Sequence, residues 1–317
     1  MTGTVYKSTG SWYNVRADDG AFYECRIKGK FRIGGLRSTN PVAVGDRVDF
    51  DLEESGGNVT GTINRIHDRQ NYIVRKSVNL SKQLHIIAAN IDYVFLIVTI
   101  DNPPTTTSFI DRFLVTAEAY GVQAVLLFGK VDTLKDETLD EQLYLQHIYS
   151  QIGYPCLRVS ATQNKGLDKL KEMMVGKTSM FAGHSGVGKS TLVNALEPGL
   201  NLKTKEISQQ HKQGQHTTTF AEMYDLSFDA RIIDTPGIRG FGIVDMEKEE
   251  IGSYFPEFFA LQSQCKFNNC LHKDEPNCAV KEALDRDEIA WSRYNSYLQM
   301  LEGDDTYRND QFAEQRL

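Results

Sequence analysis

The stretch "GHSGVGKS", residues 183–190, matches the phosphate-loop pattern G-x-x-x-x-G-K-[ST] at every fixed position. Its glycines let the backbone turn tightly, so that successive N–H groups point at phosphate oxygens. The apolar run "TSMFA" (178–182) precedes it and "TLVNAL" (191–196) follows it, and these are typical of the strand and helix that such a loop connects. The positive end of that helix adds to the attraction for phosphate. This stretch therefore predicts an α/β fold that binds a nucleotide.

We expect the whole loop to contact the nucleotide. Lys189 would reach the β- and γ-phosphates, and Ser190 would ligate Mg²⁺. A glycine-rich turn without a ligand is the alternative, which the flanking strand and helix disfavour. The predicted phosphate-side residues are Gly183, His184, Ser185, Gly186, Val187, Gly188, Lys189, Ser190 and Thr191.

The segment "IIDTPG", residues 232–237, ends the second of the two predicted strands that follow the phosphate loop. Asp234 ends an apolar run, so its carboxylate is predicted to face the Mg²⁺ through a water molecule, and Gly237 offers a backbone N–H to the γ-phosphate. An Asp that caps a turn before Pro236 is the structural alternative.

The polar segment between these motifs contains "HTTTF", residues 216–220. GTPases need a mobile Thr there that closes on Mg²⁺ and the γ-phosphate. Thr217, Thr218 and Thr219 are all candidates, and we choose Thr218. The residue after Gly237 is Ile, which cannot orient water as the Gln of many GTPases does, so His216 is a candidate for that task. An ordinary exposed loop remains the alternative for both residues.

The stretch "AVLLFGKVDT", residues 124–133, ends an apolar run with Gly129, Lys130 and Asp132. The Asp132 carboxylate can accept hydrogen bonds from N1–H and the 2-amino group of guanine, both of which adenine lacks. Lys130 can lay its aliphatic stem along the base, and the "RVSA" run adds a second base loop at Ser160 and Ala161. These residues predict GTP rather than the ATP of a P-loop ATPase or kinase. Gly129 stands where such a loop normally has Asn, which predicts weaker affinity with the GTP preference retained.

The order of these motifs along the chain is rotated, because the base loops precede the phosphate loop and the switch segments. Neighbours in a sheet need not be neighbours in the chain, so rotation preserves the site, and it is tolerated because termini usually lie close together. Strands alternating with helices from residue 90 onward predict a parallel sheet with helices on both sides. The segment after Gly237 then leads directly into the C-terminal region.

The first seventy residues are typical of a small β-barrel. An OB-fold is expected, and an SH3-like barrel is the competing fold. Residues 21–40 contain more basic than acidic side chains, and aromatic rings lie nearby, which suggests contact with RNA or simply a solvated face. The predicted strands are "GTVYKS", "WYNVRA", "AFYECRIKG", "DRVDFDLE" and "VTGTINRI". The basic residues are Arg26, Lys28, Lys30, Arg32 and Arg37, the acid is Glu24, and the rings are Phe22, Tyr23 and Phe31.

Three of the five cysteines cluster near the C-terminus, in a helical and loop-rich region. Three thiols cannot all pair with one another, which favours a metal site over a disulfide framework. Cys265, Cys270, His272 and Cys278 offer a full tetrahedral set for a structural Zn²⁺. Scattered buried thiols are the alternative. Cys25 and Cys156 are expected to be ordinary core or surface residues.

Overall composition is ordinary for a globular chain of 317 residues, with 40% hydrophobic and 24% charged residues. The net charge of −7 argues against bulk attraction to nucleic acid but allows a local basic patch. The longest apolar run, "VFLIVTI" (94–100), is too short to span a bilayer, and the N-terminus lacks the pattern of a signal peptide. We expect a cytoplasmic protein that does not enter the membrane.

The rotated motifs, the N-terminal barrel and the Cys/His cluster together resemble the RsgA (YjeQ/YloQ) family of circularly permuted bacterial GTPases. "GHSGVGKSTLVNAL", "HTTT", "DTPG" and "RYNSYLQML" carry this resemblance. It implies three domains, namely an OB-like RNA-binding barrel at 1–72, a circularly permuted GTPase domain at 73–245 and a helical zinc-binding domain at 246–317.

The resemblance also implies a function. Members act late in maturation of the small (30S) ribosomal subunit, near the decoding region of 16S rRNA, and the subunit stimulates their slow hydrolysis of GTP to GDP. The resemblance implies GTP/GDP with Mg²⁺ and one zinc ion as cofactors, and we expect a monomer. A ribosome- or RNA-binding module with a degenerate, non-hydrolysing nucleotide site is the alternative, with Gly129 as its first sign.

Overall fold

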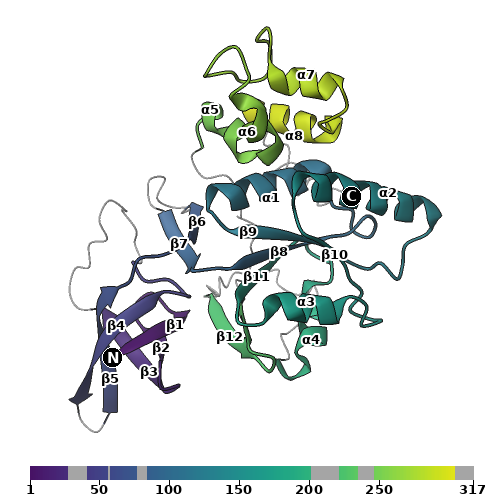
Figure 1. Cartoon of the computed structure of the whole chain (residues 1–317). Coiled ribbons are helices and arrows are strands. Elements are labelled where there is room, and N and C mark those ends of the chain that lie inside the picture. The colour runs from purple at the N-terminus through teal and green to yellow at the C-terminus, as the bar shows by residue number, and fades with distance from the viewer. Residues whose placement is uncertain (28–40, 56–57, 77–83, 201–220, 235–245, 304–317) are drawn as a thin grey trace, which may run out of the picture.

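The computed structural model describes residues 1–27, 41–55, 58–76, 84–200, 221–234 and 246–303. Figure 1 shows a β-barrel on one side, a central sheet covered by helices, and a small helical body packed against the outer face of α1. The predicted multi-domain fold class is confirmed. The domain boundaries at 72/73 and 245/246 remain predictions.

The barrel consists of β1 (Thr2–Ser8), β2 (Tyr13–Ala17), β3 (Phe22–Ile27), β4 (Arg47–Ser55) and β5 (Asn58–Ile66). Its strand order is β1-β2-β3-β5-β4, and a further β1–β4 pairing closes it. The parallel β3–β5 pair fits the Greek-key barrel expected of an OB-fold. Alternate residues of β2 point inward, and the barrel core includes Val5, Tyr13, Val15, Cys25, Phe50 and Ile63.

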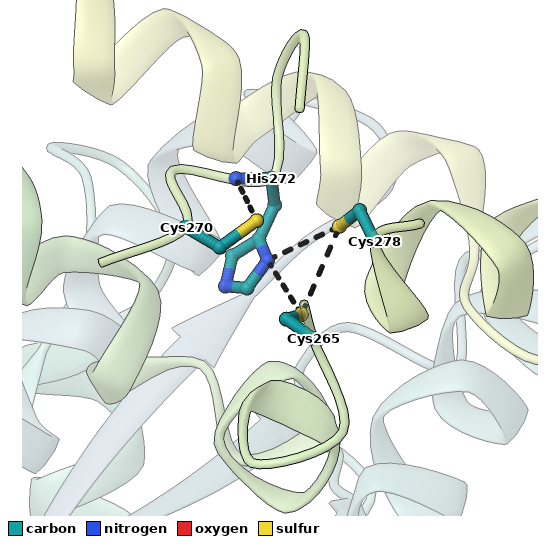
Figure 2. A group of neighbouring side chains, drawn as sticks. All are labelled: Cys265, Cys270, His272 and Cys278. Atoms are coloured by element: carbon teal, nitrogen blue, oxygen red, sulfur yellow. Dashed lines mark hydrogen bonds between the residues drawn. The ribbon is translucent and has the colours of Figure 1, made fainter. Parts of the chain in front are cut away.

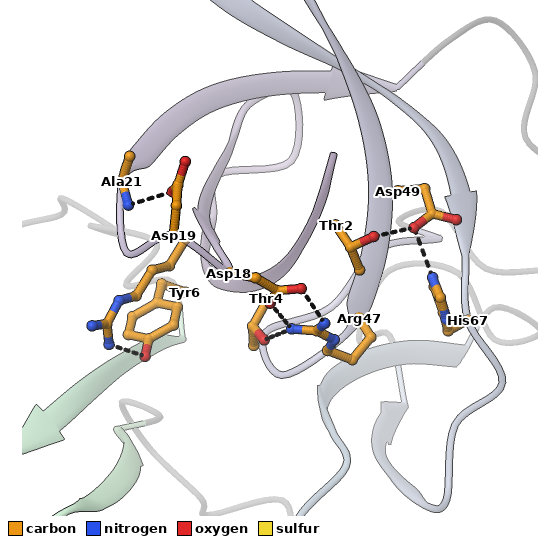
Figure 3. A network of polar contacts seen from close by, with 10 residues as sticks. Thr2, Thr4, Tyr6, Asp18, Asp19, Ala21, Arg47, Asp49 and His67 are labelled. Carbon is orange, nitrogen blue, oxygen red and sulfur yellow. Dashed lines mark hydrogen bonds and ion pairs between the residues drawn. The ribbon is translucent and has the colours of Figure 1, made fainter.

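A polar seam joins β1 to β4 where the barrel closes (Figure 3). Thr2 Oγ1 donates to Asp49 Oδ1 at 2.9 Å, and His67 Nε2 lies 2.9 Å from the same oxygen. Arg47 makes two bonds of 2.7 and 2.9 Å to Asp18. These contacts lower the pKa of Asp18, mainly through Arg47, and that of Asp49, mainly through His67.

The central sheet has the order β10-β9-β8-β11-β13-β12. Its strands are β8 (Tyr93–Val98), β9 (Gln123–Phe128), β10 (Cys156–Arg158), β11 (Thr178–Ala182), β12 (Glu222–Leu226) and β13 (Ala230–Asp234). Five of these strands run parallel to their neighbours, as expected, but β12 runs antiparallel to β13. The expected parallel sheet thus carries one antiparallel strand, because the short turn between β12 and β13 permits only a hairpin.

Helices cover both faces of this sheet, as predicted. On one face lie α1 (Thr107–Ala119) and α2 (Asp136–Ile152), and on the other lie α3 (Leu167–Met174) and α4 (Lys189–Leu196), followed by the short η1 (Pro198–Leu200) (Figure 1). Two separate apolar clusters fill these faces. Strands β8, β9 and β11 are mostly apolar because each is buried on both sides over most of its length.

Two connections link the barrel to the central sheet. Strand β1 pairs with β12 at Lys7 and Glu222, where the two side chains also form an ion pair of 3.1 Å. A hairpin of β6 (Tyr72–Lys76) and β7 (Leu84–Ala89), which the sequence analysis did not anticipate, forms a second small sheet. Its β7 bridges to Val44 through Ala88, and Arg69 binds the buried Asp46 nearby at 2.6 Å.

The C-terminal body contains α5 (Lys248–Ile251), η2 (Gly252–Tyr254), α6 (Pro256–Gln262), α7 (Ala279–Asp285) and α8 (Trp291–Glu302). Its core includes Phe255, Phe258, Val280, Tyr294 and Tyr297, together with Val115 of α1. This shared core fixes the body to the GTPase sheet through α1 and α8. Among the described residues, no helix is long and apolar enough to cross a membrane.

Candidate nucleotide site and metal centre

The phosphate loop connects β11 to α4, as the sequence predicted. Gly183, Gly186 and Gly188 have φ values of 149°, 85° and 97°, which side chains with a Cβ rarely adopt. A Cβ at Gly183 would lie 2.9 Å from Val187 and 3.0 Å from the carbonyl of Ile97. The pattern of glycines is therefore required by the path of the backbone.

Lys189 and Ser190 begin α4, and both are half-buried. Strand β13 lies beside β11, so Asp234 at its end comes close to Lys189. Burial raises the pKa of Asp234, and the Lys189 ammonium opposes that rise. A carboxylate and an ammonium thus face the same end of the loop, where charged phosphates and a divalent cation would be held. Thr191, also in the first turn of α4, is exposed.

The base loop and the phosphate loop meet at one side chain. Lys130 Nζ donates to the carbonyl of Gly186 at 2.9 Å and to that of Asn102 at 2.6 Å. Lys130 and Gly186 are 56 residues apart in the sequence. The parallel strands β9 and β11, which lie on either side of β8, carry the two loops at their carboxyl ends, where ligands of open α/β sheets bind. The rotated order of motifs is therefore compatible with a single site.

Asp132 lies at the opposite side of this base loop. Its exposed carboxylate accepts a hydrogen bond from Thr162 Oγ1 at 3.0 Å. Hydrogen bonding by Ser160, and then by Thr162, lowers the pKa of Asp132, so the carboxylate stays ionised. Ser160 itself is buried, and it forms paired backbone bonds of 3.0 Å with Lys165 that close the second base loop. Ala161 follows at its half-buried tip.

Gly129 follows strand β9 and has an ordinary negative φ, so its lack of a side chain is not required by a left-handed backbone. A Cβ there would lie 3.1 Å from Cγ2 of Ile97 and 3.7 Å from Cγ2 of Thr99. A side chain at this position therefore needs Ile97 to shift by a few tenths of an ångström.

Some predicted site residues lie outside the described residues. These are Gly237, His216 and Thr218, with the other candidates Thr217 and Thr219. In contrast, Asn102, Phe109 and Thr162 contact the site but were not predicted. Asn102 follows β8, which lies directly beside β11 in the sheet. The position of Asn102 after the carboxyl end of a predicted strand could have indicated its place in the site, because the loops that follow parallel strands all lie at one edge of the sheet.

The Cys/His residues of the C-terminal body form a compact group between α6 and α7 (Figure 2). One ligand atom from each residue lies within 4.8 Å of the others. Cys278 Sγ is 3.3 Å from His272 Nδ1, and Cys265 Sγ is 3.6 Å from the same nitrogen and 4.0 Å from Cys278 Sγ. Zn–S bonds of about 2.3 Å put tetrahedral sulfurs about 3.8 Å apart. The group can therefore hold a zinc ion.

Two tyrosines of α8 hold the loop that carries His272. Tyr294 donates to the carbonyl of His272 at 2.7 Å, and Tyr297 donates to that of Leu271 at 2.6 Å. Burial raises the pKa of the Cys270 thiol to about 12 and lowers the pKa of His272. The imidazole is thus neutral, as a metal ligand must be. Thiols that resist ionisation alone become thiolates only beside a cation, so the chemistry of this group also fits a metal.

Several aromatic rings of the barrel lie next to arginines. The Arg26 guanidinium lies 4.1 Å from the ring centre of Trp12, and that of Arg16 lies 5.9 Å from the rings of both Tyr6 and Phe22. Phe22 is 53% exposed. Tyr23 is half-buried and packs against Phe50, and Glu24 is exposed. The other predicted RNA contacts, Lys28, Lys30, Phe31, Arg32 and Arg37, lie outside the described residues.

Residues 66–244 match the family model described as RsgA GTPase, and residues 2–60 match the RsgA N-terminal domain. The chain belongs to the RsgA GTPase family. The resemblance seen in the sequence is therefore confirmed, and so is the predicted class of enzyme, a GTPase.

The chain is also similar to individual RsgA proteins. It is 75% identical, over 100% of its length and 98% of the other chain, to the small ribosomal subunit biogenesis GTPase RsgA of Flavobacterium johnsoniae. It is 56% identical to RsgA 2 of Bacteroides thetaiotaomicron, over 95% of this chain and 96% of the other.

Two solved structures share the fold. YjeQ from Thermotoga maritima has a TM-score of 0.78 at 36% identity, covering 95% of this chain and 97% of its own. YloQ, described as a circularly permuted GTPase, has a TM-score of 0.74 at 29% identity, covering 95% and 94%. A permuted GTPase with the same arrangement supports the rotated motif order found in this RsgA chain.

Proposed function

We propose that this RsgA-family chain hydrolyses GTP as a timing switch in late maturation of the small ribosomal subunit, where it binds 16S rRNA near the decoding region. Relatives at up to 75% identity carry the name of small ribosomal subunit biogenesis GTPases, which supports the subunit as partner. A monomeric, cytoplasmic protein fits this role.

One observation carries the nucleotide site, namely the hydrogen bond of 2.9 Å from Lys130 to Gly186 of the phosphate loop. It ties the guanine-recognising loop to the phosphate-binding loop at a fixed spacing. Asp132 pairs with N1–H and the 2-amino group of guanine, while Ser160 and Ala161 border the base from the second loop. Residues 183–191 surround the phosphates.

Phosphoryl transfer needs positioning and charge neutralisation more than covalent chemistry. Lys189 contacts the β- and γ-phosphates, and Gly237 offers its N–H to the γ-phosphate. Ser190, Thr218 and Asp234 would hold Mg²⁺, which when bound would supply positive charge to the transferred group. His216 is the candidate that orients the attacking water. Intrinsic hydrolysis is slow because Ile238 offers no polar group there, and the small subunit supplies the missing organisation.

The barrel supplies the RNA contacts. Arg26 lies over the ring of Trp12, and the ring of Phe22 is exposed; this combination of a cation and stacking surfaces binds unpaired nucleotides without requiring a strict sequence. The zinc bound by the C-terminal Cys₃His group is structural. Its four ligands leave no open position for catalysis.

The test is GTPase turnover measured with and without purified 30S subunits. We expect slow turnover alone and strong stimulation by the subunit. Lys189→Ala should abolish both activities, and a Phe22→Ala/Arg26→Ala variant should lose stimulation only. Stimulation that persists in the double variant at raised salt would remove the barrel from the proposal.

The competing hypothesis is an RNA-binding module with a non-hydrolysing site, for which Gly129 is the supporting observation. Single-turnover hydrolysis with subunits present separates the two, because a degenerate site would show subunit binding without phosphate release. Nucleotide competition also tests the base site, since ATP should not displace bound GDP.

A further inference from the structure

The second residue of the phosphate loop makes a close ring contact outside the loop. The imidazole of His184 lies against the ring of Phe109 on α1, with centroids 3.9 Å apart and planes inclined by 32°. Burial lowers the pKa of His184, so the ring is neutral near pH 7. A neutral imidazole on a benzene ring is an uncharged aromatic pair, and such pairs favour a defined geometry.

Phe109 projects from a firmly held part of α1. Thr106 caps the helix and accepts a hydrogen bond from the backbone N–H of Phe109 at 3.3 Å. The preceding loop is closed by Thr105, which bonds to the backbone of Thr99 with both its N–H and its hydroxyl group. Two residues further along α1, the buried Asp111 forms an ion pair with Arg293 of the C-terminal body. The ring of Phe109 is therefore a fixed support.

The loop before α1 borders the phosphate loop at a second point. The Lys130 ammonium joins the carbonyl of Asn102 to that of Gly186. A Cβ at Gly186 would lie 3.6 Å from Cδ of Pro103, so this loop passes directly beside the tip of the phosphate loop. The segment 102–109 thus borders the phosphate loop at two points, His184 and Gly186.

We infer that Phe109 and His184 are positioning residues for the nucleotide, whose stacked rings hold the phosphate loop in its binding arrangement. This inference rests on the proposed function, because it takes the loop as the phosphate site. A loop that is already held loses little freedom when the ligand binds, whereas a released loop must be ordered at the expense of affinity. An aromatic pair of this kind changes an equilibrium constant by roughly 2- to 12-fold.

The test measures the Kd of a fluorescent GDP analogue and the melting temperature for His184→Ala, Phe109→Leu and the double variant. We expect each single variant to bind roughly 3- to 10-fold more weakly, and the double variant to bind no more weakly than the worse single variant. His184→Phe should keep the affinity of the unaltered protein, because it keeps the ring without the nitrogens. Tyr144→Ala, which removes an exposed ring on α2, is the control and should leave the Kd unchanged.

Additive effects in the double variant, or a His184→Phe variant as weak as His184→Ala, would overturn the inference. A fall in melting temperature with unchanged Kd would do the same, since it would make the stack merely structural. If His184→Ala fails to fold, His184→Gln against His184→Phe gives the same comparison of a chain with and without a ring. The Lys189→Ala variant distinguishes a failure of this inference from a failure of the proposed function. If that variant binds GDP as tightly as the unaltered protein, the proposed nucleotide site itself is wrong.

Discussion

The Arg293 guanidinium lies 2.8 Å from the Asp111 carboxylate, although the two residues are 182 positions apart in the chain. Both side chains are almost fully buried, and Arg293 makes two more bonds, of 2.7 and 3.0 Å, to Glu257. Tyr149 also donates to Asp111, at 2.7 Å. This buried group joins α8 of the zinc body to α1 of the GTPase sheet.

Replacing Arg293 with Met should therefore destabilise the protein by about 3–5 kcal/mol, because it leaves the Asp111 carboxylate buried without its partner. Chemical denaturation checks this. Arg286→Met is the matched control, since Arg286 pairs with Glu288 at 2.8 Å on the exposed surface and should contribute little. Equal losses in the two variants would show that burial of the pair adds nothing to its contribution.

Exchanging Asp132 for Asn should change which base is bound. The amide keeps one acceptor but offers a donor where the 2-amino group of guanine needs an acceptor, so GDP should bind roughly 10- to 100-fold more weakly. Xanthosine diphosphate has a carbonyl at that position and should bind more tightly than GDP does. Titration of the variant with both nucleotides measures the exchange. An unaltered preference for GDP would place the base elsewhere.

The ionisation of Asp132 also predicts how affinity depends on pH. Its pKa is lowered, first by the hydrogen bond with Ser160, so the carboxylate keeps its charge below the ordinary range of an Asp near 3.9. A group with a lowered pKa contributes above that range and loses its contribution only as the pH falls through the lowered value. The ratio of GDP affinities between the unaltered protein and Asp132→Asn should thus be constant from pH 8 to pH 5. A ratio that already declines between pH 7 and pH 6 would contradict the assignment of Asp132 as the ionised carboxylate that binds guanine.

Gly129 can be tested with two substitutions that differ by one amide group. Gly129→Ala measures the effect of placing a Cβ 3.1 Å from Ile97, and Gly129→Asn adds the side chain usual at this position. We expect the Asn variant to bind GDP more tightly than the Ala variant, because the amide can hold the base and the phosphate loop. Calorimetry gives both constants. Equal affinities would mean that the loop no longer has room to use the amide.

Removing one metal ligand should unfold the C-terminal body selectively. Cys278→Ser is expected to lose its zinc and to lower the melting temperature of this body, because the binding energy of structural zinc is also folding energy. Metal analysis and calorimetry check both effects. Cys156→Ser is the control, since that half-buried thiol lies outside the group. Full zinc content in Cys278→Ser would exclude the proposed ligand set.

Local pattern was enough to predict most elements of this fold. Strand "QAVLLF" coincides with β9, and the phosphate loop lies between its strand and helix, because these features depend on residues close in sequence. The β6–β7 hairpin was missed, and the antiparallel direction of β12 was not anticipated. In both cases the length of the segment between two strands indicates how they pair, whereas the composition of the strands does not.

The contacts between distant elements could not be predicted in this way. Asp111 on an amphipathic helix has the appearance of a solvent-facing residue until α8 is packed on it. The contact between Phe109 and His184 likewise depends on which strand lies beside β11. The base-loop residues could be proposed because their chemistry is specific to guanine, whereas supporting residues such as Thr162 carry no chemistry that distinguishes them in a sequence.

The pairing of β1 with β12 has a consequence for how the molecule behaves at high concentration. An antiparallel strand at the border of a sheet offers free N–H and C=O groups on which another chain can assemble. Here the barrel occupies that border, with the Lys7–Glu222 ion pair and the 2.6 Å Arg16–Asp225 contact across the join. At the opposite border, β10 is only three residues long. The barrel therefore also protects its own GTPase sheet from self-association, and a chain shortened by its barrel should aggregate.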